Sequence, residues 1–194
     1  VGSAKEVSAP FGNPIIFLFL GSFVIAEAMS ASGLDRRAAC AILALRRVGA
    51  SPSRILAAFA AGTAVLSMWL SNTATTAMMY PIGMGILAAV ARLIARGDGP
   101  TPSRYGTALM LATAYVASNG GIATPVGTPP NLIVVGLLDS LAGTRVSFFR
   151  WMLLATSVML LMLAALLLYL RLALRPEVDR IAGGGETLRA ERAA

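Results

Sequence analysis

An uncharged run of 37 residues, from Ile55 to Ala91, is the feature that most limits how this chain can fold. Near its centre lie three consecutive small polar residues, Ser71, Asn72 and Thr73, and Ser67 precedes Ser71 by four residues. A polar group left unsatisfied in hydrocarbon costs several kcal/mol, so these side chains must face protein, water or a bound solute. The run therefore needs a polar partner at its midpoint.

The composition places this run in a membrane protein. The chain is 57% hydrophobic and 13% charged, with a mean hydropathy of +0.75, whereas about a quarter of the residues in a soluble domain are charged. The sequence contains no histidine, which removes the commonest general base and metal ligand and argues against an enzyme. We expect an integral membrane protein that contacts lipid, is not an enzyme and carries no cofactor.

The net charge of +7 comes from arginine clusters between the apolar runs. These clusters do not form a basic stripe with interleaved aromatic residues, so we expect no nucleic-acid partner. They agree better with the positive-inside rule, which predicts that the arginine-rich loops lie in the cytoplasm. We expect the protein in the inner (plasma) membrane of a bacterium. The predicted cytoplasmic side collects Arg36, Arg37, Arg46, Arg47, Arg54, Arg92, Arg96, Arg104, Arg171, Arg175 and Arg180.

Helix start signals and charged breaks divide the chain into seven segments. Asn13 followed by Pro14, for example, is a favourable N-cap and first helical position. The predicted segments are an N-terminal flank (1–12), a transmembrane helix (13–31), an interfacial or cytoplasmic amphipathic helix (35–49), a helical hairpin with a Ser-Asn-Thr tip (53–95), a broken transmembrane helix (104–141), a transmembrane helix (147–172) and a polar tail (173–194).

The hairpin is expected to be re-entrant. Two full membrane crossings need about 20 residues each and a turn, and the uncharged run of 37 residues is slightly short for that. A hairpin whose tip lies inside the membrane fits better, and the Ser-Asn-Thr triplet would form that tip.

A second polar break interrupts the next apolar run, at 118–131 (SNGGIATPVGTPPN). Two adjacent glycines and three prolines do not allow a continuous helix. Thr128 followed by Pro129 predicts a new helix start, with free backbone carbonyls before it around Gly127. We therefore expect one transmembrane helix broken in two.

A hairpin tip brings the carbonyl end of one helix to the amide end of the next. The carbonyls, with the side-chain oxygens of Ser67, Ser71 and Asn72, suit a hard cation such as Na⁺, and the amides that begin near Thr73 suit an anion. The second break offers a similar pair of features. Two interrupted helices at membrane depth predict the binding site of a transporter.

Hydroxyl groups in apolar helices also have a purely structural role. Most bond to their own backbone or to a neighbouring helix, and we expect this of Thr63, Thr75 and Thr113. Asn72 is harder to explain in this way, because an amide has four hydrogen-bonding positions to satisfy. Trp151, at one end of the last apolar run, is expected to anchor that helix at the membrane surface.

Three stretches, 13–21 (NPIIFLFLG), 67–79 (SMWLSNTATTAMM) and 126–132 (VGTPPNL), resemble the divalent anion:sodium symporter family, which carries dicarboxylates, citrate or sulfate. The resemblance covers about Phe11 to Leu170 in matching order. It implies an all-α, polytopic membrane protein with a re-entrant helical hairpin and a discontinuous transmembrane helix. Together these elements would form one half of an inverted-repeat, elevator-type transporter.

The same resemblance implies which residues bind the ion and the substrate. For the coupling sodium ion they are Ser67, Ser71, Asn72 and the backbone near Gly127. For the small anionic substrate they are Asn72, Thr73 and Thr128.

Only one Ser-Asn-Thr triplet and one Gly-Thr-Pro-Pro-Asn motif occur in the sequence. The resemblance therefore implies a second repeat outside this sequence that completes the site, and a homodimer at full length. We expect this chain to be a fragment of a longer carrier. Two alternatives stay open: an arsenite or other metalloid-anion permease of the related superfamily, and a non-transporting membrane scaffold.

Overall fold

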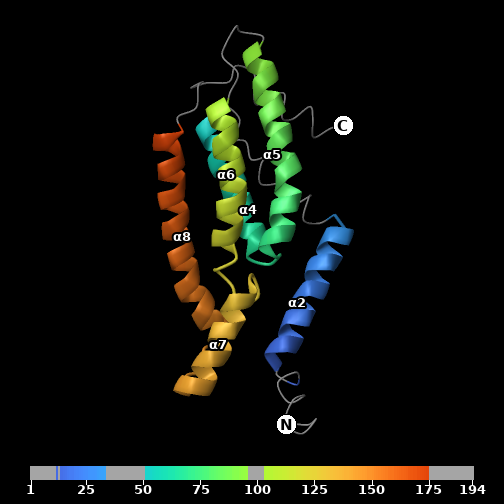
Figure 1. Ribbon diagram of the computed structural model, residues 1–194, viewed down its shortest axis with the longest axis vertical. Helices are drawn as coiled ribbons and strands as arrows, with labels where there is room; N and C mark the ends of the chain where they lie inside the picture. The colour runs from blue at the N-terminus through green and yellow to red at the C-terminus, as the bar shows by residue number, and fades with distance from the viewer. Residues whose placement is uncertain (1–11, 13, 34–50, 96–102, 175–194) are drawn as a thin grey trace, which may run out of the picture.

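The computed structural model describes residues 12, 14–33, 51–95 and 103–174 (Figure 1). These residues form helices joined by turns and irregular segments, with no β-strand among them. The prediction of an all-α fold is thus confirmed for this part of the chain. The amphipathic helix predicted at 35–49 lies outside the described residues, as do residues 1–11 and 175–194 of the predicted flanks.

Two of the connections between consecutive helices are short. A turn at residues 68–71 joins α4 to α5, and an irregular segment at residues 121–128 joins α6 to α7. The bounds are α2 (Pro14–Ala31), α4 (Pro52–Ser67), α5 (Asn72–Ala95), α6 (Ser103–Gly120), α7 (Pro129–Ala142) and α8 (Phe148–Ala173).

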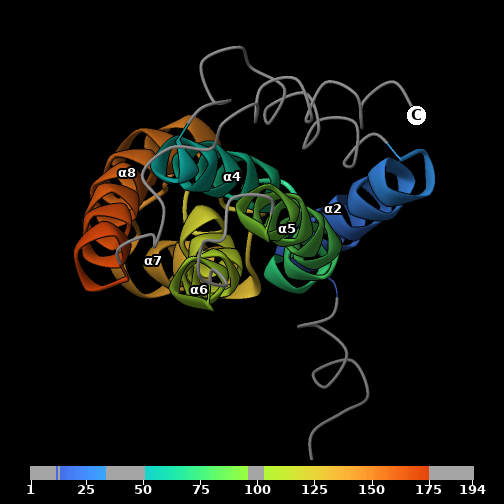
Figure 2. The same cartoon turned by 90° about the horizontal axis from the view of Figure 1, so that it is seen from above.

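Helix α6 is the central element, because it packs against α4, α5 and α8. These four helices run side by side along the long axis of the molecule in Figure 1. The view from above in Figure 2 shows α8 and α5 on opposite sides of α6. Helix α7 lies beyond the end of α6 at an angle to it, and α2 stands outside the four-helix group and contacts α7 (Figure 1).

Local sequence explains most helix ends. Ser51 and Thr128 have extended backbones, with φ of −138° and −150°, and each is followed by a proline that begins its helix. Helix α7 ends at Gly143, whose φ of 60° is a left-handed conformation that glycine adopts without steric cost. Helix α8 begins after Ser147, whose hydroxyl accepts a hydrogen bond from the Arg150 amide at 3.3 Å.

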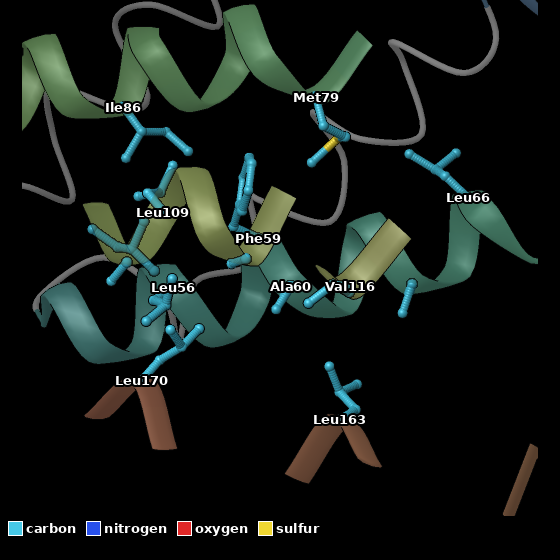
Figure 3. Packing of buried hydrophobic residues seen from close by; sticks show 14 of the residues in the cluster. Leu56, Phe59, Ala60, Leu66, Met79, Ile86, Leu109, Val116, Leu163 and Leu170 are labelled. Atoms are coloured by element: carbon cyan, nitrogen blue, oxygen red, sulfur yellow. The ribbon is translucent and has the colours of Figure 1, made fainter. Parts of the chain in front are cut away.

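The core lies where α4, α5, α6 and α8 meet (Figure 3). Its members recur at helical spacing, so that each helix turns one apolar face inward. None of the labelled side chains is more than 9% exposed. They are Leu56, Phe59, Ala60 and Leu66 of α4, Met79 and Ile86 of α5, Leu109 and Val116 of α6, and Leu163 and Leu170 of α8.

Helices α4 and α6 approach one another at the level of their backbones. A Cβ atom added to Gly120, the last residue of α6, would lie 2.5 Å from the carbonyl oxygen of Ala64 and 2.8 Å from its Cα. Small residues allow this distance, and they bring the end of α6 directly against the last turn of α4.

The outer surface of the described helices is strongly apolar. Helix α8 turns Ala155, Met159 and Leu163 inward, whereas Leu153 and Leu161 are 79% and 72% exposed. Judged by length and composition, α8 is the one helix among those described that is long enough and apolar enough to cross a membrane. Its 26 residues extend about 39 Å at 1.5 Å per residue.

Replacing Gly120 with alanine is expected to destabilise the protein by about 1–3 kcal/mol, the usual range for overpacking. The added methyl group meets backbone atoms of Ala64, which cannot turn aside as the end of a side chain can. The matched control is Gly85→Ala in α5, where nothing lies within 4 Å of the added Cβ. Thermal unfolding of both variants in detergent is the measurement, and equal melting temperatures would contradict the close approach.

Candidate functional site

Amide groups in the turn between α4 and α5 donate hydrogen bonds to carbonyl groups near the end of α4. The Leu66 carbonyl accepts hydrogen bonds from the amides of Trp69 at 3.1 Å and Leu70 at 2.9 Å, and the Ala64 carbonyl accepts one from Met68 at 3.1 Å. The turn is therefore tight, and the first residue of α5, Asn72, lies close to the last residue of α4, Ser67.

Helix α5 begins with amide groups that point out of the helix end. The Ser71 hydroxyl accepts a hydrogen bond from the Ala74 amide at 3.2 Å, and its carbonyl accepts one from the Thr75 amide at 2.9 Å. The amides of Asn72 and Thr73 belong to the first turn and have no acceptor within the helix. Thr73 is exposed, so the positive end of the α5 dipole faces outward at this residue.

Three oxygen atoms from three helices meet at the hairpin tip. The Ser67 hydroxyl oxygen lies 2.9 Å from Asn72 Oδ1 and 2.6 Å from the Ala117 carbonyl oxygen of α6. A serine hydroxyl has one hydrogen, so it satisfies one of these two acceptors at a time, while the Ala117 carbonyl also accepts a hydrogen bond from the Gly121 amide at 3.2 Å. The cluster is completed either by turning the Asn72 amide, so that its NH₂ group donates to Ser67, or by a cation that all three oxygens coordinate.

A cation at this cluster would meet neutral oxygens. Within the described ranges, no group of three His, Cys, Asp or Glu side chains is placed to hold a metal ion. Carboxylates are characteristic ligands of Ca²⁺ and Mg²⁺, whereas rings of neutral carbonyl oxygens bind monovalent ions. The chemistry of the cluster therefore favours a monovalent cation.

The segment between α6 and α7 reaches the hairpin tip through Gly121. A Cβ atom on Gly121 would collide with Asn72 Oδ1, so the side chain of Asn72 rests on the bare backbone of this glycine. Gly127 lies one layer further away, because its own added Cβ would be 2.5 Å from the Gly121 carbonyl oxygen. The two breaks do come together, and Gly121 is the glycine in contact with Asn72.

Side chains from α7 and α8 hold the carbonyl groups of this segment. Asn131 Nδ2 donates to the carbonyls of Gly121 and Thr124, each at 2.8 Å. The Trp151 indole donates to the Ile122 carbonyl at 3.0 Å. Asn131 is 7% exposed, so these bonds are sheltered from water and fix the path of the segment.

Thr124 attaches the same segment to the hairpin. Its hydroxyl, which is fully buried, donates to the Met68 carbonyl in the turn after α4 and accepts from the Gly127 amide at 3.0 Å. The sequence motif Gly-Thr-Pro-Pro-Asn drew attention to Asn131, but no local signal marked Thr124 or Trp151 as its companions. These contacts depend on residues that are 29 to 56 positions apart.

The start of α7 is poor in hydrogen-bond donors. Its first two residues, Pro129 and Pro130, have no amide hydrogen, and the Asn131 amide donates to the Thr128 carbonyl at 3.1 Å. The Thr128 hydroxyl makes no capping bond to this helix. The α7 end therefore offers the half-buried Thr128 hydroxyl, whereas the α5 end offers backbone amides.

Two of the three threonines with a predicted structural role have it. Thr63 donates to the Phe59 carbonyl at 2.8 Å, and Thr113 donates to the Leu109 carbonyl at 2.9 Å, which confirms that their hydroxyls bond to their own helices. The hydroxyl of Thr75 has no hydrogen-bond partner among the described residues although it is buried. The prediction is therefore wrong for Thr75.

Two helix breaks that meet around uncharged oxygen atoms form the kind of site used by helical membrane carriers. A comparison with known families agrees with this class, since the family described as citrate transporter matches residues 1–190. The chain belongs to this family of integral membrane transport proteins.

Individual relatives carry more specific names. The chain is 38% identical over 188 residues to the sodium-dependent dicarboxylate transporter SdcS of Staphylococcus saprophyticus, across 95% of this chain and 36% of that protein. It is also 38% identical over 182 residues to SdcS of Staphylococcus aureus strain USA300, across 93% of this chain and 35% of that protein. The resemblance to the divalent anion:sodium symporters is confirmed, and the chain spans about a third of the length of these relatives.

Replacing Asn131 with alanine is expected to loosen the segment 121–127 specifically. The change leaves the buried Gly121 carbonyl without its donor and leaves the Thr124 carbonyl with only the longer bond from the Gly127 amide at 3.3 Å, at a cost of about 1–3 kcal/mol. Hydrogen exchange followed by mass spectrometry should show faster exchange in this segment.

The matched control is Ser140→Ala, also in α7, whose exposed hydroxyl bonds only to the Leu137 carbonyl within its own helix at 3.3 Å. It should leave the exchange rates unchanged. Uniformly faster exchange along α6, α7 and α8 in Asn131→Ala would contradict the prediction that Asn131 holds only the segment 121–127 in place.

Proposed function

We propose that this chain forms part of a sodium-coupled carrier of carboxylate anions and supplies one wall of its ion and substrate site. The observation that carries this proposal is the oxygen cluster of Ser67, Asn72 and Ala117 beside the open amide end of α5. Family membership and the names of the relatives support the same function. The whole carrier would have the length of those relatives.

Sodium would bind at the oxygen cluster. Ser67 and Asn72 contribute side-chain oxygens, and the Ala117 carbonyl contributes the negative end of the α6 dipole. Ser71 adds its hydroxyl oxygen from the adjoining turn, although that oxygen also caps α5. Gly127 acts indirectly, because it supports Gly121, which in turn supports Asn72.

The anionic substrate would bind on the other side of Asn72. The outward amides of Asn72 and Thr73 suit a carboxylate, with the Thr73 hydroxyl within the same helical turn. The Thr128 hydroxyl, which does not cap α7, would be a further contact of the substrate. Dicarboxylate or citrate agrees best with the names of the family and the relatives, and sulfate is the other divalent anion considered.

Asn72 links the binding of the cation to the binding of the anion. Its side-chain oxygen lies in the oxygen cluster with Ser67, and its backbone amide would face the bound anion. A bound cation would fix the side chain and lower the electrostatic cost of bringing an anion into a site of low dielectric constant. This shared residue provides a physical basis for coupling the substrate to sodium.

The short lengths of α4 and α7 support a re-entrant hairpin and a broken helix, whereas α5, with 24 residues, is long enough for a full span. With 16 residues, α4 extends about 24 Å, which is less than the hydrocarbon thickness of about 30 Å. With 14 residues, α7 extends about 21 Å. The tip at residues 68–72 and the segment at 121–128 would thus lie at membrane depth, in contact with protein and water.

The larger assembly follows from the same proposal. Arginine-rich segments would face the cytoplasm of a bacterial cell, and a second repeat of the carrier would provide the opposite wall of the site. The full-length carrier would be a homodimer. A metalloid-anion permease would instead show uptake that does not depend on sodium, and a scaffold would show no uptake.

In the intact carrier, Asn72→Ala is expected to abolish sodium-dependent uptake, because it removes the side chain that faces the cation and rests on Gly121. Uptake of radiolabelled succinate, citrate or sulfate into proteoliposomes, with and without a sodium gradient, is the measurement. A loss of at least 100-fold, or about 2.7 kcal/mol, is expected for a ligand shared by two bound species.

The matched control is Ser157→Ala in α8, whose exposed hydroxyl bonds to the Leu153 carbonyl of its own helix. It should transport at the normal rate. Normal uptake by Asn72→Ala at equal protein levels would refute the site, and uptake by the unaltered carrier without sodium would favour the permease.

A further inference from the structure

The hydroxyl group of Thr75 is buried in the protein without a partner. Its residue is 0% exposed, and Thr75 Oγ1 has no hydrogen-bond partner among the described residues. A buried polar group in this state is unfavourable and rare in folded proteins, so it calls for an explanation, and a bound water or ion is one.

Neighbouring threonines show that a partner within the helix is normally accessible. Thr63, Thr76 and Thr113 each donate to the carbonyl four residues earlier, at 2.8 to 2.9 Å. The equivalent acceptor for Thr75 is the Ser71 carbonyl, which receives the Thr75 backbone amide at 2.9 Å but not its hydroxyl. The side chain of Thr75 is thus turned away from the position that its neighbours adopt.

The position of Thr75 on α5 directs it toward the hairpin tip. It follows Asn72 by three residues and Ser71 by four, so all three share one face of the helix. Side chains in an α-helix lean toward the N-terminus and cover the preceding turn. Thr75 therefore lies one helical turn from Asn72, on the face of α5 that is buried in the protein.

We infer that Thr75 is a further ligand of the cation that binds at Ser67 and Asn72, an inference that rests on the function proposed above. Its oxygen would complete a set of neutral oxygens from α4, α5 and α6 and would find its partner only when the site is filled. Ca²⁺, which is also a hard cation, takes six to eight oxygen ligands. By comparison, a site with three protein oxygens has room for a further ligand. An added hydroxyl is chemically equivalent to the one that Ser67 provides.

The test compares sodium binding in two variants of the intact carrier. Thr75→Val keeps the shape of the side chain and removes its hydroxyl, and Thr113→Val makes the same change where the hydroxyl bonds to its own helix. The melting temperature in detergent is followed while NaCl replaces choline chloride at constant ionic strength, without substrate.

Thr75→Val is expected to raise the sodium concentration for half-maximal stabilisation about tenfold, as for the loss of one contact to a charged group. Without sodium its melting temperature should equal or exceed that of the unaltered carrier, because an unsatisfied hydroxyl has been removed. Thr113→Val should leave the sodium titration unchanged. A Thr75→Val titration that is also unchanged would overturn the inference, and so would an equal loss of stability with and without sodium.

A second pair keeps the test decisive if Thr75→Val does not fold. Thr75→Ser and Thr75→Ala both lack the methyl group and differ by the hydroxyl alone, so a ligand role requires the serine variant to bind sodium more tightly. Equal titrations of this pair would overturn the ligand role. If the unaltered carrier shows no sodium-dependent shift, the proposed function fails as well, whereas a normal shift with no effect of Thr75 removes this inference alone.

Discussion

The close contact between the end of α6 and the tip of the α4–α5 hairpin determines the rest of this structure. Gly120 meets the backbone of Ala64, and Gly121 meets the side chain of Asn72. A side chain at Gly120 would push the ends of α4 and α6 apart, and one at Gly121 would displace the side chain of Asn72. Because the contact is between backbones, the carbonyl of Ala117 comes within hydrogen-bonding distance of Ser67. The candidate cation cluster is thus a direct consequence of glycine at two adjacent positions.

The site achieves electrostatic contrast without formal charge. Helix ends supply partial negative charge from carbonyls and partial positive charge from amides within a few residues of each other. Formal charges buried at this depth would carry a large desolvation penalty when the site is empty. In the proposed carrier, neutral dipoles would avoid that penalty and would still attract a cation and an anion to adjacent positions.

A layer of polar side chains behind the site keeps the irregular backbone in place. Asn131, Trp151 and Thr124 bond to carbonyls that would otherwise be unsatisfied in the segment between α6 and α7 or in the hairpin turn. Trp151, expected from its position to anchor α8 at the membrane surface, donates its indole N–H to the Ile122 carbonyl. Irregular backbone at membrane depth requires such partners, because lipid offers none.

Local residue chemistry was sufficient to predict the helical fold, the helix starts at Pro14 and Pro129, and the two polar breaks. N-caps, prolines and glycines act over a few residues and can therefore be read directly from the sequence. Which oxygen atoms meet was decided by tertiary structure alone. Gly121 rather than Gly127 contacts Asn72, and Thr75 differs from Thr63 and Thr113 in having no helical partner among the described residues. These outcomes depend on how closely α4, α5 and α6 pack, and that distance is set by side chains far apart in the chain.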